Sequence, residues 1–241
     1  MTDEFVKLLD QGCVDLGVTL SDQQKEQFFK YYEMLIAKNE VMNLTAITEF
    51  EEVVQKHFID SVMIKEVREL GDNEKWIDVG TGAGFPGIPL KIVYPQLQVT
   101  LLDSLNKRVK FLQEVVDALG LEQVEALHGR AEEYAKKAEY REQYDCCVSR
   151  AVANLASLSE YCLPFVKVGG AFVPYKSGKI QEEIEAAGKA VEILGGWIGQ
   201  RKEFMLPGSD MYRCLLYIEK VKATAKKYPR KAGMPTKEPL H

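Results

Sequence analysis

The sequence lacks the cysteine and histidine patterns that mark disulfide-built and metal-binding proteins. None of its five cysteines forms a C-x-x-C pair, and none of its three histidines lies at metal-ligand spacing from a cysteine. An odd number of unpatterned cysteines argues against a disulfide framework and against a zinc site. We expect no metal, and we expect these thiols to be buried in a reducing compartment: Cys13, Cys146, Cys147, Cys162 and Cys214.

Long apolar runs are also missing. No stretch approaches the roughly 20 apolar residues of a membrane span, and the N-terminus from Met1 to Gly12 carries acids and no apolar signal region. The 241 residues, 46% of them hydrophobic and 28% charged, are enough for one large domain with a sizeable core. The composition predicts a cytoplasmic globular protein without a membrane partner.

An overall excess of positive charge is absent, since the formal net charge is -5. The charge is unevenly distributed, however, because residues 222–241 hold six Lys and Arg against one acid. A basic tail on an acidic body is a candidate for phosphate binding, with Arg230 and Lys231 as possible RNA contacts. A solvated terminus explains the same charges.

The first seventy residues predict helices. Ser21 and Gln24 have the spacing of a capping box before a run with helical periodicity. Thr48 and Glu51 suggest a second capping box, and residues 39–45 between the two helices suggest a turn. We expect residues 1–70 to form an N-terminal helical extension.

After Gly71 short apolar runs alternate with amphipathic helices, which predicts βαβ units and an α/β fold with a mostly parallel, doubly wound sheet. The last two strands have no helix between them and suggest an antiparallel hairpin at one edge. We expect a domain over 71–221 and a tail over 222–241. The predicted strands are 76–79, 99–102, 124–127, 146–148, 171–173, 197–204 and 213–219, and the predicted helices are 109–119, 155–163 and 180–194.

A glycine-rich loop between the first strand and the next helix is the most informative stretch. Gly82, Gly84 and Gly87 satisfy G-x-G-x-x-G, which by itself is weak evidence for a dinucleotide. Asp78 ends the strand, two residues before Gly80. A negative charge there opposes a pyrophosphate and suits the ammonium and sulfonium of S-adenosylmethionine (SAM).

Asp103 ends the following strand, where a carboxylate can accept both hydroxyls of a ribose. Either cofactor offers these hydroxyls, so Asp103 supports nucleoside binding without choosing between SAM and a nicotinamide. The order of Asp78 and the glycines is typical of SAM-dependent methyltransferases. An NAD-dependent oxidoreductase and a non-catalytic RNA-binding protein on a methyltransferase fold are the alternatives.

The segment after the fourth strand, residues 147–154, bears on the methyl acceptor. It lacks the Asp/Asn-Pro-Pro-aromatic run used for amino-group methylation of bases. No cysteine has the proline or threonine neighbour typical of the nucleophile used for pyrimidine C5. These absences favour an acceptor that is already nucleophilic.

Five motifs together resemble the glucose-inhibited division protein B family: Asn43-Leu-Thr45, Lys56-His-Phe-Ile-Asp-Ser61, Asp78 to Gly87, Ser149-Arg-Ala-Val152 and Tyr228 to Pro235. The resemblance covers nearly the whole chain. It implies a Rossmann-like class I methyltransferase fold. It also implies transfer of a methyl group from SAM to N7 of a guanine in the 530 loop of 16S rRNA, either on the RNA or on the small-subunit particle.

The resemblance also implies site residues. Gly80 and Phe85 would line the methionine and adenosine part of the pocket, Ala131 and Glu132 would meet the adenine, and Arg150 would lie at the cofactor or the target base. Glu132 can accept a hydrogen bond from the adenine amino group. It can equally be an acid that stabilises a helix N-terminus.

Further candidates have competing interpretations. His57 and Asp60 either shape the mouth of the pocket or form a hydrogen-bonded junction between helices, and the same choice holds for Asn43. Lys176 follows a strand end and is a candidate RNA contact or a solvated lysine.

Overall fold

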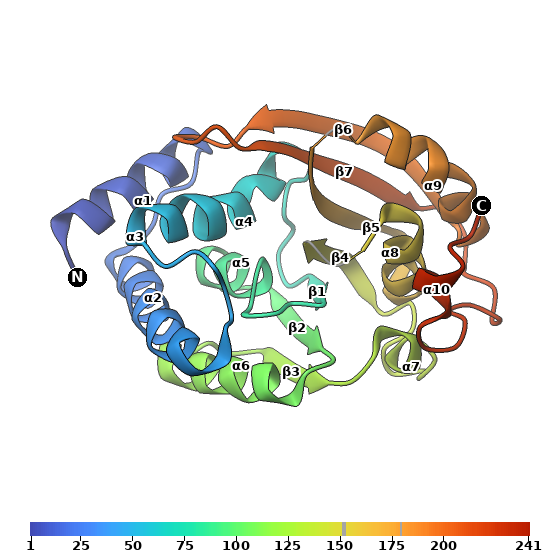
Figure 1. Cartoon of the computed structure of the whole chain (residues 1–241), viewed down its shortest axis with the longest axis horizontal. Helices are drawn as coiled ribbons and strands as arrows, with labels where there is room; N and C mark the ends of the chain where they lie inside the picture. Colours follow the sequence, from blue (N-terminus) through green and yellow to red (C-terminus); the bar gives the residue numbers. More distant parts are fainter. Residues whose placement is uncertain (151–152, 179) are drawn as a thin grey trace.

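The computed structural model describes residues 1–150, 153–178 and 180–241, and it contains one seven-stranded sheet between two layers of helices (Figure 1). Ala151 and Val152 of the fourth motif lie outside the described residues. The strand order is β3-β2-β1-β4-β5-β7-β6. The strands span β1 Lys75–Val79, β2 Gln98–Asp103, β3 Val124–His128, β4 Tyr144–Arg150, β5 Val166–Ser177, β6 Gly196–Met205 and β7 Tyr212–Lys220.

Strands β1 to β5 pair in parallel, and β7 runs antiparallel to both β5 and β6. The predicted antiparallel hairpin is therefore present, with β6 at the edge and β7 inserted next to β5. The order reverses between β1 and β4, so the carboxyl ends of these two strands flank the crevice where doubly wound folds bind their ligands.

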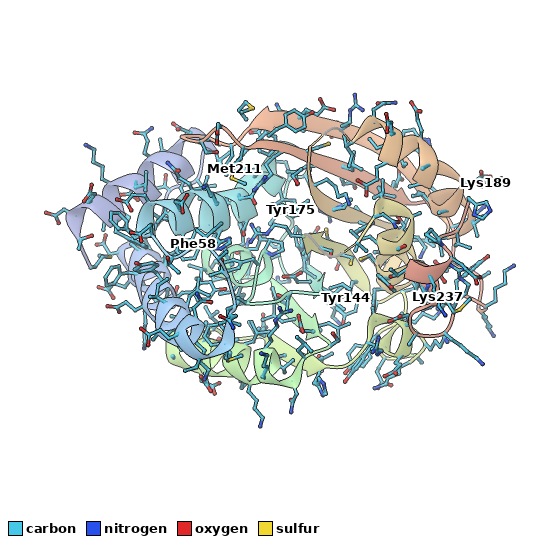
Figure 2. All side chains as sticks on the ribbon, viewed as in Figure 1. Phe58, Tyr144, Tyr175, Lys189, Met211 and Lys237 are labelled. Carbon is cyan, nitrogen blue, oxygen red and sulfur yellow. The ribbon has the colours of Figure 1, made fainter. Side chains whose placement is uncertain are left out.

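The central strands β1 and β2 are buried on both faces of the sheet, which explains their near-continuous apolar runs. Trp76, Leu101 and Val148 face a core shared with the N-terminal helices, whereas Ile77 and Leu102 face a second core. Side chains fill the space between each helical layer and the sheet (Figure 2). The first layer includes α1 Asp3–Asp15, α2 Asp22–Met42, α5 Gly87–Val93 and α6 Asn106–Leu119, and the second α7 Ala131–Tyr134, α8 Leu155–Cys162 and α9 Gln181–Ile193.

The first capping box is confirmed. Gln24 N–H donates to Ser21 Oγ at 3.3 Å, and Ser21 N–H donates to Gln24 Oε1 at 2.8 Å. The turn expected over residues 39–45 begins later, because α2 continues through Met42 and ends at Asn43 with a φ of 49°. Asn43 therefore forms the left-handed end of α2.

The prediction of a second capping box at Thr48 and Glu51 is wrong. The helix α3, Phe50–Val53, begins after Glu49 without a side-chain cap. The chain then continues as a π-helix, Val54–Ile59, followed by α4, Asp60–Val62, and a 3₁₀ turn, Met63–Glu66. A π-helical turn is rare and changes which side chains share a face. Here it contains His57 and is followed directly by Asp60.

The C-terminal segment folds back onto the domain. A short helix, α10 (Met234–Lys237), packs on α8 (Figure 1), and a 3₁₀ turn, Leu163–Phe165, links α8 to β5. All five cysteines are free and buried, as expected. Within the described ranges, no helix combines the length and the apolar character that crossing a membrane requires.

Candidate active site

The glycine loop lies at the carboxyl end of β1. Gly80, Gly82 and Gly84 have φ values of 73°, 64° and 109°, a region that favours glycine. A Cβ added to Gly82 would meet nothing within 4 Å, whereas one on Gly84 would lie 2.6 Å from the Tyr31 hydroxyl. Gly82 therefore borders open space that a ligand can approach, and Gly84 is needed for packing beneath the loop.

Asp78 shapes this loop from below. Its Oδ2 accepts hydrogen bonds from the Thr81 hydroxyl at 2.7 Å and from Gly87 N–H at 2.8 Å. Its Oδ1 is buried and has no hydrogen-bond partner among the described residues. Burial raises the pKa of Asp78 to about 6. An orphaned carboxylate oxygen beside the loop fits a cationic ligand such as SAM.

Asp103 lies at the end of β2, next to the loop. Its side chain accepts Gly82 N–H at 2.9 Å and Leu105 N–H at 2.8 Å, and the residue is 3% exposed. A carboxylate has about four lone-pair sites, so two remain for other donors. The residue is thus fixed in place with acceptor capacity left for the two ribose hydroxyls.

Two cavities meet at Gly80. The smaller one, about 170 Å³, is lined by Val79, Gly80, Leu102, Ser104, Gly129, Arg130, Ala131, Glu132 and Tyr161. The larger one, about 510 Å³, contains Gly82 and Phe85 of the loop together with His57, Asp60 and Arg150. We call them the small cavity and the large cavity. Ala131 and Glu132 therefore line the small cavity, whereas His57, Asp60 and Arg150 line the large one.

Glu132 has a partner of its own in this structure. The residue is 5% exposed, and its Oε1 accepts Gly233 N–H from the C-terminal segment at 2.9 Å. It also lies in the first turn of α7. The helix-stabilising and the adenine-binding interpretations are therefore compatible with the same position.

Asp60 joins two arginines in the large cavity. Its Oδ2 accepts Arg150 Nη1 at 2.8 Å and its Oδ1 accepts Arg213 Nε at 3.0 Å, while Asp60 itself is 1% exposed. The guanidinium of Arg150 also lies 5.2 Å from the centroid of the Phe85 ring. One carboxylate between two guanidinium groups leaves a net positive charge facing the cavity.

His57 is a neutral member of this cluster. Its ring stacks on Phe85 with centroids 4.5 Å apart. Burial and the Arg150 charge lower the pKa of His57 to about 3. Arg150 Nη2 lies 3.4 Å from Nδ1, and since a guanidinium only donates, Nδ1 accepts and the Nε2 hydrogen points to Thr45 Oγ1 at 2.9 Å. Both ring nitrogens are occupied.

Two contributors were missed by sequence reasoning. Arg213 is the second residue of β7 and belongs to no motif, although an arginine at the end of a strand in the predicted hairpin was a usable signal. Tyr31 lies in α2 and was not singled out from the sequence, yet its hydroxyl donates to the Ala83 carbonyl at 2.6 Å and braces the glycine loop.

The three predicted RNA contacts differ in their exposure and in their ion-pair partners. Lys176 lines the large cavity and pairs with Glu183 at 2.5 Å. Arg230 pairs with Glu160 at 2.7 Å, and Lys231 is exposed. Their role in RNA binding stays a prediction.

Comparison with known proteins agrees with this geometry. A protein from Lachnoclostridium phytofermentans named ribosomal RNA small subunit methyltransferase G is 56% identical over 95% of this chain and 95% of its own. One of the same name from Alkaliphilus metalliredigens is 54% identical over 98% of this chain and 99% of its own.

Among solved structures, a SAM-dependent methyltransferase from Aquifex aeolicus has a TM-score of 0.52 at 21% identity, covering 69% of this chain and 92% of that one. M. jannaschii TYW2 in complex with AdoMet has a TM-score of 0.51 at 16% identity, covering 63% of this chain and 71% of that one. These likenesses confirm the predicted class I methyltransferase fold.

A family model described as GidB, rRNA small subunit methyltransferase G, matches residues 24–204. The family match and the fold together confirm the expectation of SAM over a nicotinamide cofactor. The resemblance found in the sequence is confirmed as well, and the chain belongs to the GidB family of rRNA small subunit methyltransferases.

Proposed function

We propose that the protein transfers the methyl group of SAM to N7 of a guanine in the 530 loop of 16S rRNA. The observation that carries the choice of acceptor is the state of His57. This histidine lines the large cavity, yet it is neutral with a pKa of about 3 and both its ring nitrogens are occupied. Guanine N7 bears an in-plane lone pair and no proton, so it needs no general base.

When bound, SAM would supply an electrophilic methyl group on a sulfonium; the lone pair of guanine N7 would accept that methyl group, and S-adenosylhomocysteine would be the leaving product. The protein's residues hold the reactants in line. Asp103 would accept the ribose hydroxyls, Glu132 would meet the adenine amino group, and the buried carboxylate of Asp78 would place negative charge beneath the loop. Positioning of this kind accounts for much of the rate of a group transfer that needs no proton removal.

Arg150 has the role of positioning the target base. Its guanidinium is held by Asp60 and lies over Phe85, at the edge of the large cavity that adjoins Gly80. A guanidinium does not lose its proton in a protein, so Arg150 orients the base and does not act as a base itself. Lys176 and Lys231 are proposed RNA contacts, and the cytoplasm, where ribosomal RNA is assembled, is the proposed location.

The function is tested by incubating the protein with tritiated-methyl SAM and small-subunit ribosomal RNA or particles, followed by mapping of the modified base. Label at N7 of one guanine in the 530 loop is the expected result. RNA that binds without becoming labelled would instead favour a non-catalytic RNA-binding protein on the same fold.

We expect Asp103→Ala to weaken SAM binding by roughly 2–4 kcal/mol, since it removes two charge-assisted hydrogen bonds to the ribose. The same change also frees Gly82 N–H in the loop. Titration calorimetry measures the effect, with Asp117→Ala on the outer side of α6 as the control. SAM affinity equal to that of the wild type would refute the assignment of Asp103.

The pH dependence should separate chemistry from cofactor binding. We expect kcat at saturating SAM to stay flat from about pH 5 to about pH 8, because the pKa of His57 is about 3 and the proposed methyl transfer uses no general base that would titrate in this range. The KM for SAM should rise as the pH falls below about 6, since Asp78 has a pKa of about 6 and becomes neutral on protonation.

Single-turnover rates and SAM titrations over this pH range provide both readouts. A single-turnover rate that collapses on protonation of one group, and that imidazole restores in His57→Ala, would show that a general base takes part.

A further inference from the structure

The C-terminal segment, residues 224–237, is anchored to the domain by an ion pair whose acid is fully buried. Arg230 donates from Nε and Nη2 to the carboxylate of Glu160 at 2.7 to 3.1 Å, and its backbone N–H donates to the same carboxylate at 2.7 Å. Glu160 lies in α8 and is 0% exposed. A buried charge without its partner is strongly unfavourable, so this pair fixes where the segment lies.

Beyond the ion pair, the segment contacts two residues that line the small cavity. Gly233 N–H donates to Glu132 Oε1 at 2.9 Å, and the hydroxyls of Thr236 and Tyr161 lie 2.7 Å apart. Both Glu132 and Tyr161 belong to the lining of that cavity. The segment therefore braces the wall of the cavity from outside.

These contacts tie the segment to both helices that carry this wall. Glu132 is in α7, while Glu160 and Tyr161 are neighbours in α8, on which α10 packs (Figure 1). Gly233 has a φ of 81°, a conformation that glycine adopts freely. Since Gly233 occupies one oxygen of Glu132, it fixes the orientation of the carboxylate and leaves the second oxygen for an adenine amino group.

We propose that residues 228–237 of the C-terminal segment are part of the cofactor-binding site, with Arg230 as a positioning residue for the adenine subsite. Through Glu160, Arg230 holds Gly233 and Thr236 against Glu132 and Tyr161. This inference rests on the proposed function, which places adenine in the small cavity. It gives Arg230 a role inside the protein, in place of the RNA contact that its charge alone suggested.

The first test compares Arg230→Met with Lys226→Met, which removes an equal charge from an exposed position of the C-terminal segment that lies before residue 228. We expect Arg230→Met to raise the KM and the Kd for SAM about tenfold, with kcat at saturating SAM and affinity for RNA unchanged. Lys226→Met should leave SAM affinity unchanged. Arg230→Lys keeps the charge without the planar fork and should restore part of the affinity.

The second test asks whether the adenine end is affected. S-adenosylhomocysteine is compared with S-inosylhomocysteine, in which an oxo group replaces the adenine amino group. The wild type should prefer the adenine ligand, and Arg230→Met should lose most of that preference. Thr236→Val removes only the exposed hydroxyl contact with Tyr161 and should weaken SAM binding about twofold in a fully folded protein.

Two results would overturn the inference. One is wild-type SAM affinity in both Arg230→Met and Thr236→Val. The other is an equal loss of the adenine and inosine ligands, with a lowered melting temperature. In both cases the proposed function would still stand, provided that the wild-type protein itself binds SAM. A wild-type protein that binds no SAM would refute the proposed function.

Discussion

Replacement of Asp60 by alanine is expected to lower the free energy of unfolding by about 3–5 kcal/mol and to abolish methyl transfer. Asp60 is 1% exposed and is the shared acceptor for Arg150 and Arg213, whose side chains are only 14% and 13% exposed. Without the carboxylate two neighbouring guanidinium groups face each other in a half-buried site. Urea denaturation and a methyl-transfer assay measure the two effects.

A surface ion pair provides the matched control. Glu66 pairs with Lys202 at 2.9 Å, with side chains 31% and 49% exposed, so Glu66→Ala should cost less than about 1 kcal/mol and leave transfer intact. Asp60→Asn keeps the shape of the side chain and one acceptor oxygen, so its loss of unfolding free energy should lie between those of Glu66→Ala and Asp60→Ala. Equal stability of Asp60→Ala and Glu66→Ala would mean that the arginine cluster is solvated and not held by Asp60.

Local sequence patterns predicted the parallel strands well. A strand buried on both faces needs a continuous apolar run, as β1 and β2 show, and these two strands and the edge strand β3 were each predicted within one residue at either end. Strand β5 was predicted only over 171–173, because Lys167 and the pair Gly169-Gly170 interrupt its apolar run. Its backbone pairing with β4 and β7 extends it from Val166 to Ser177, and no side-chain pattern reports that pairing.

The residues of the candidate site also fall into two groups, one predictable from spacing along the chain and one brought together only by the fold. Asp78, Gly82 and Asp103 follow one another along two adjacent strand ends, so spacing along the chain was enough to predict that they lie close together. The contact between Asp60 and Arg213 joins residues 153 positions apart, and it depends on where β7 inserts in the sheet. Long-range pairings of this kind leave no periodic signal in one sequence.

The C-terminal tail shows a different limit. Its charge predicted solvent or RNA contact, which suits exposed Lys231. The partner of Arg230 is a buried glutamate in α8, a helix that reads as apolar core from its sequence. A charge count cannot tell a cation bound within the protein from one that faces a ligand.

The acceptor atom itself is tested by substrate chemistry. RNA with 7-deazaguanine at the target replaces N7 by a carbon–hydrogen unit, so the in-plane lone pair is lost while the shape of the base is kept. We expect no methyl transfer to this RNA, against full transfer to the guanine control, because nothing else in the proposed geometry is an acceptor.

Binding should survive the substitution, since the arginine cluster and the RNA backbone contacts do not require N7. Affinity for the two RNAs, measured at one salt concentration with bound S-adenosylhomocysteine, should therefore agree within about threefold. Methyl transfer to the deaza RNA would show that another atom is the acceptor. An amino group is far less nucleophilic than N7, so its methylation needs a general base. His57 does not provide one, because it is neutral and both its ring nitrogens are hydrogen-bonded, and its place in the cavity would then need a new explanation.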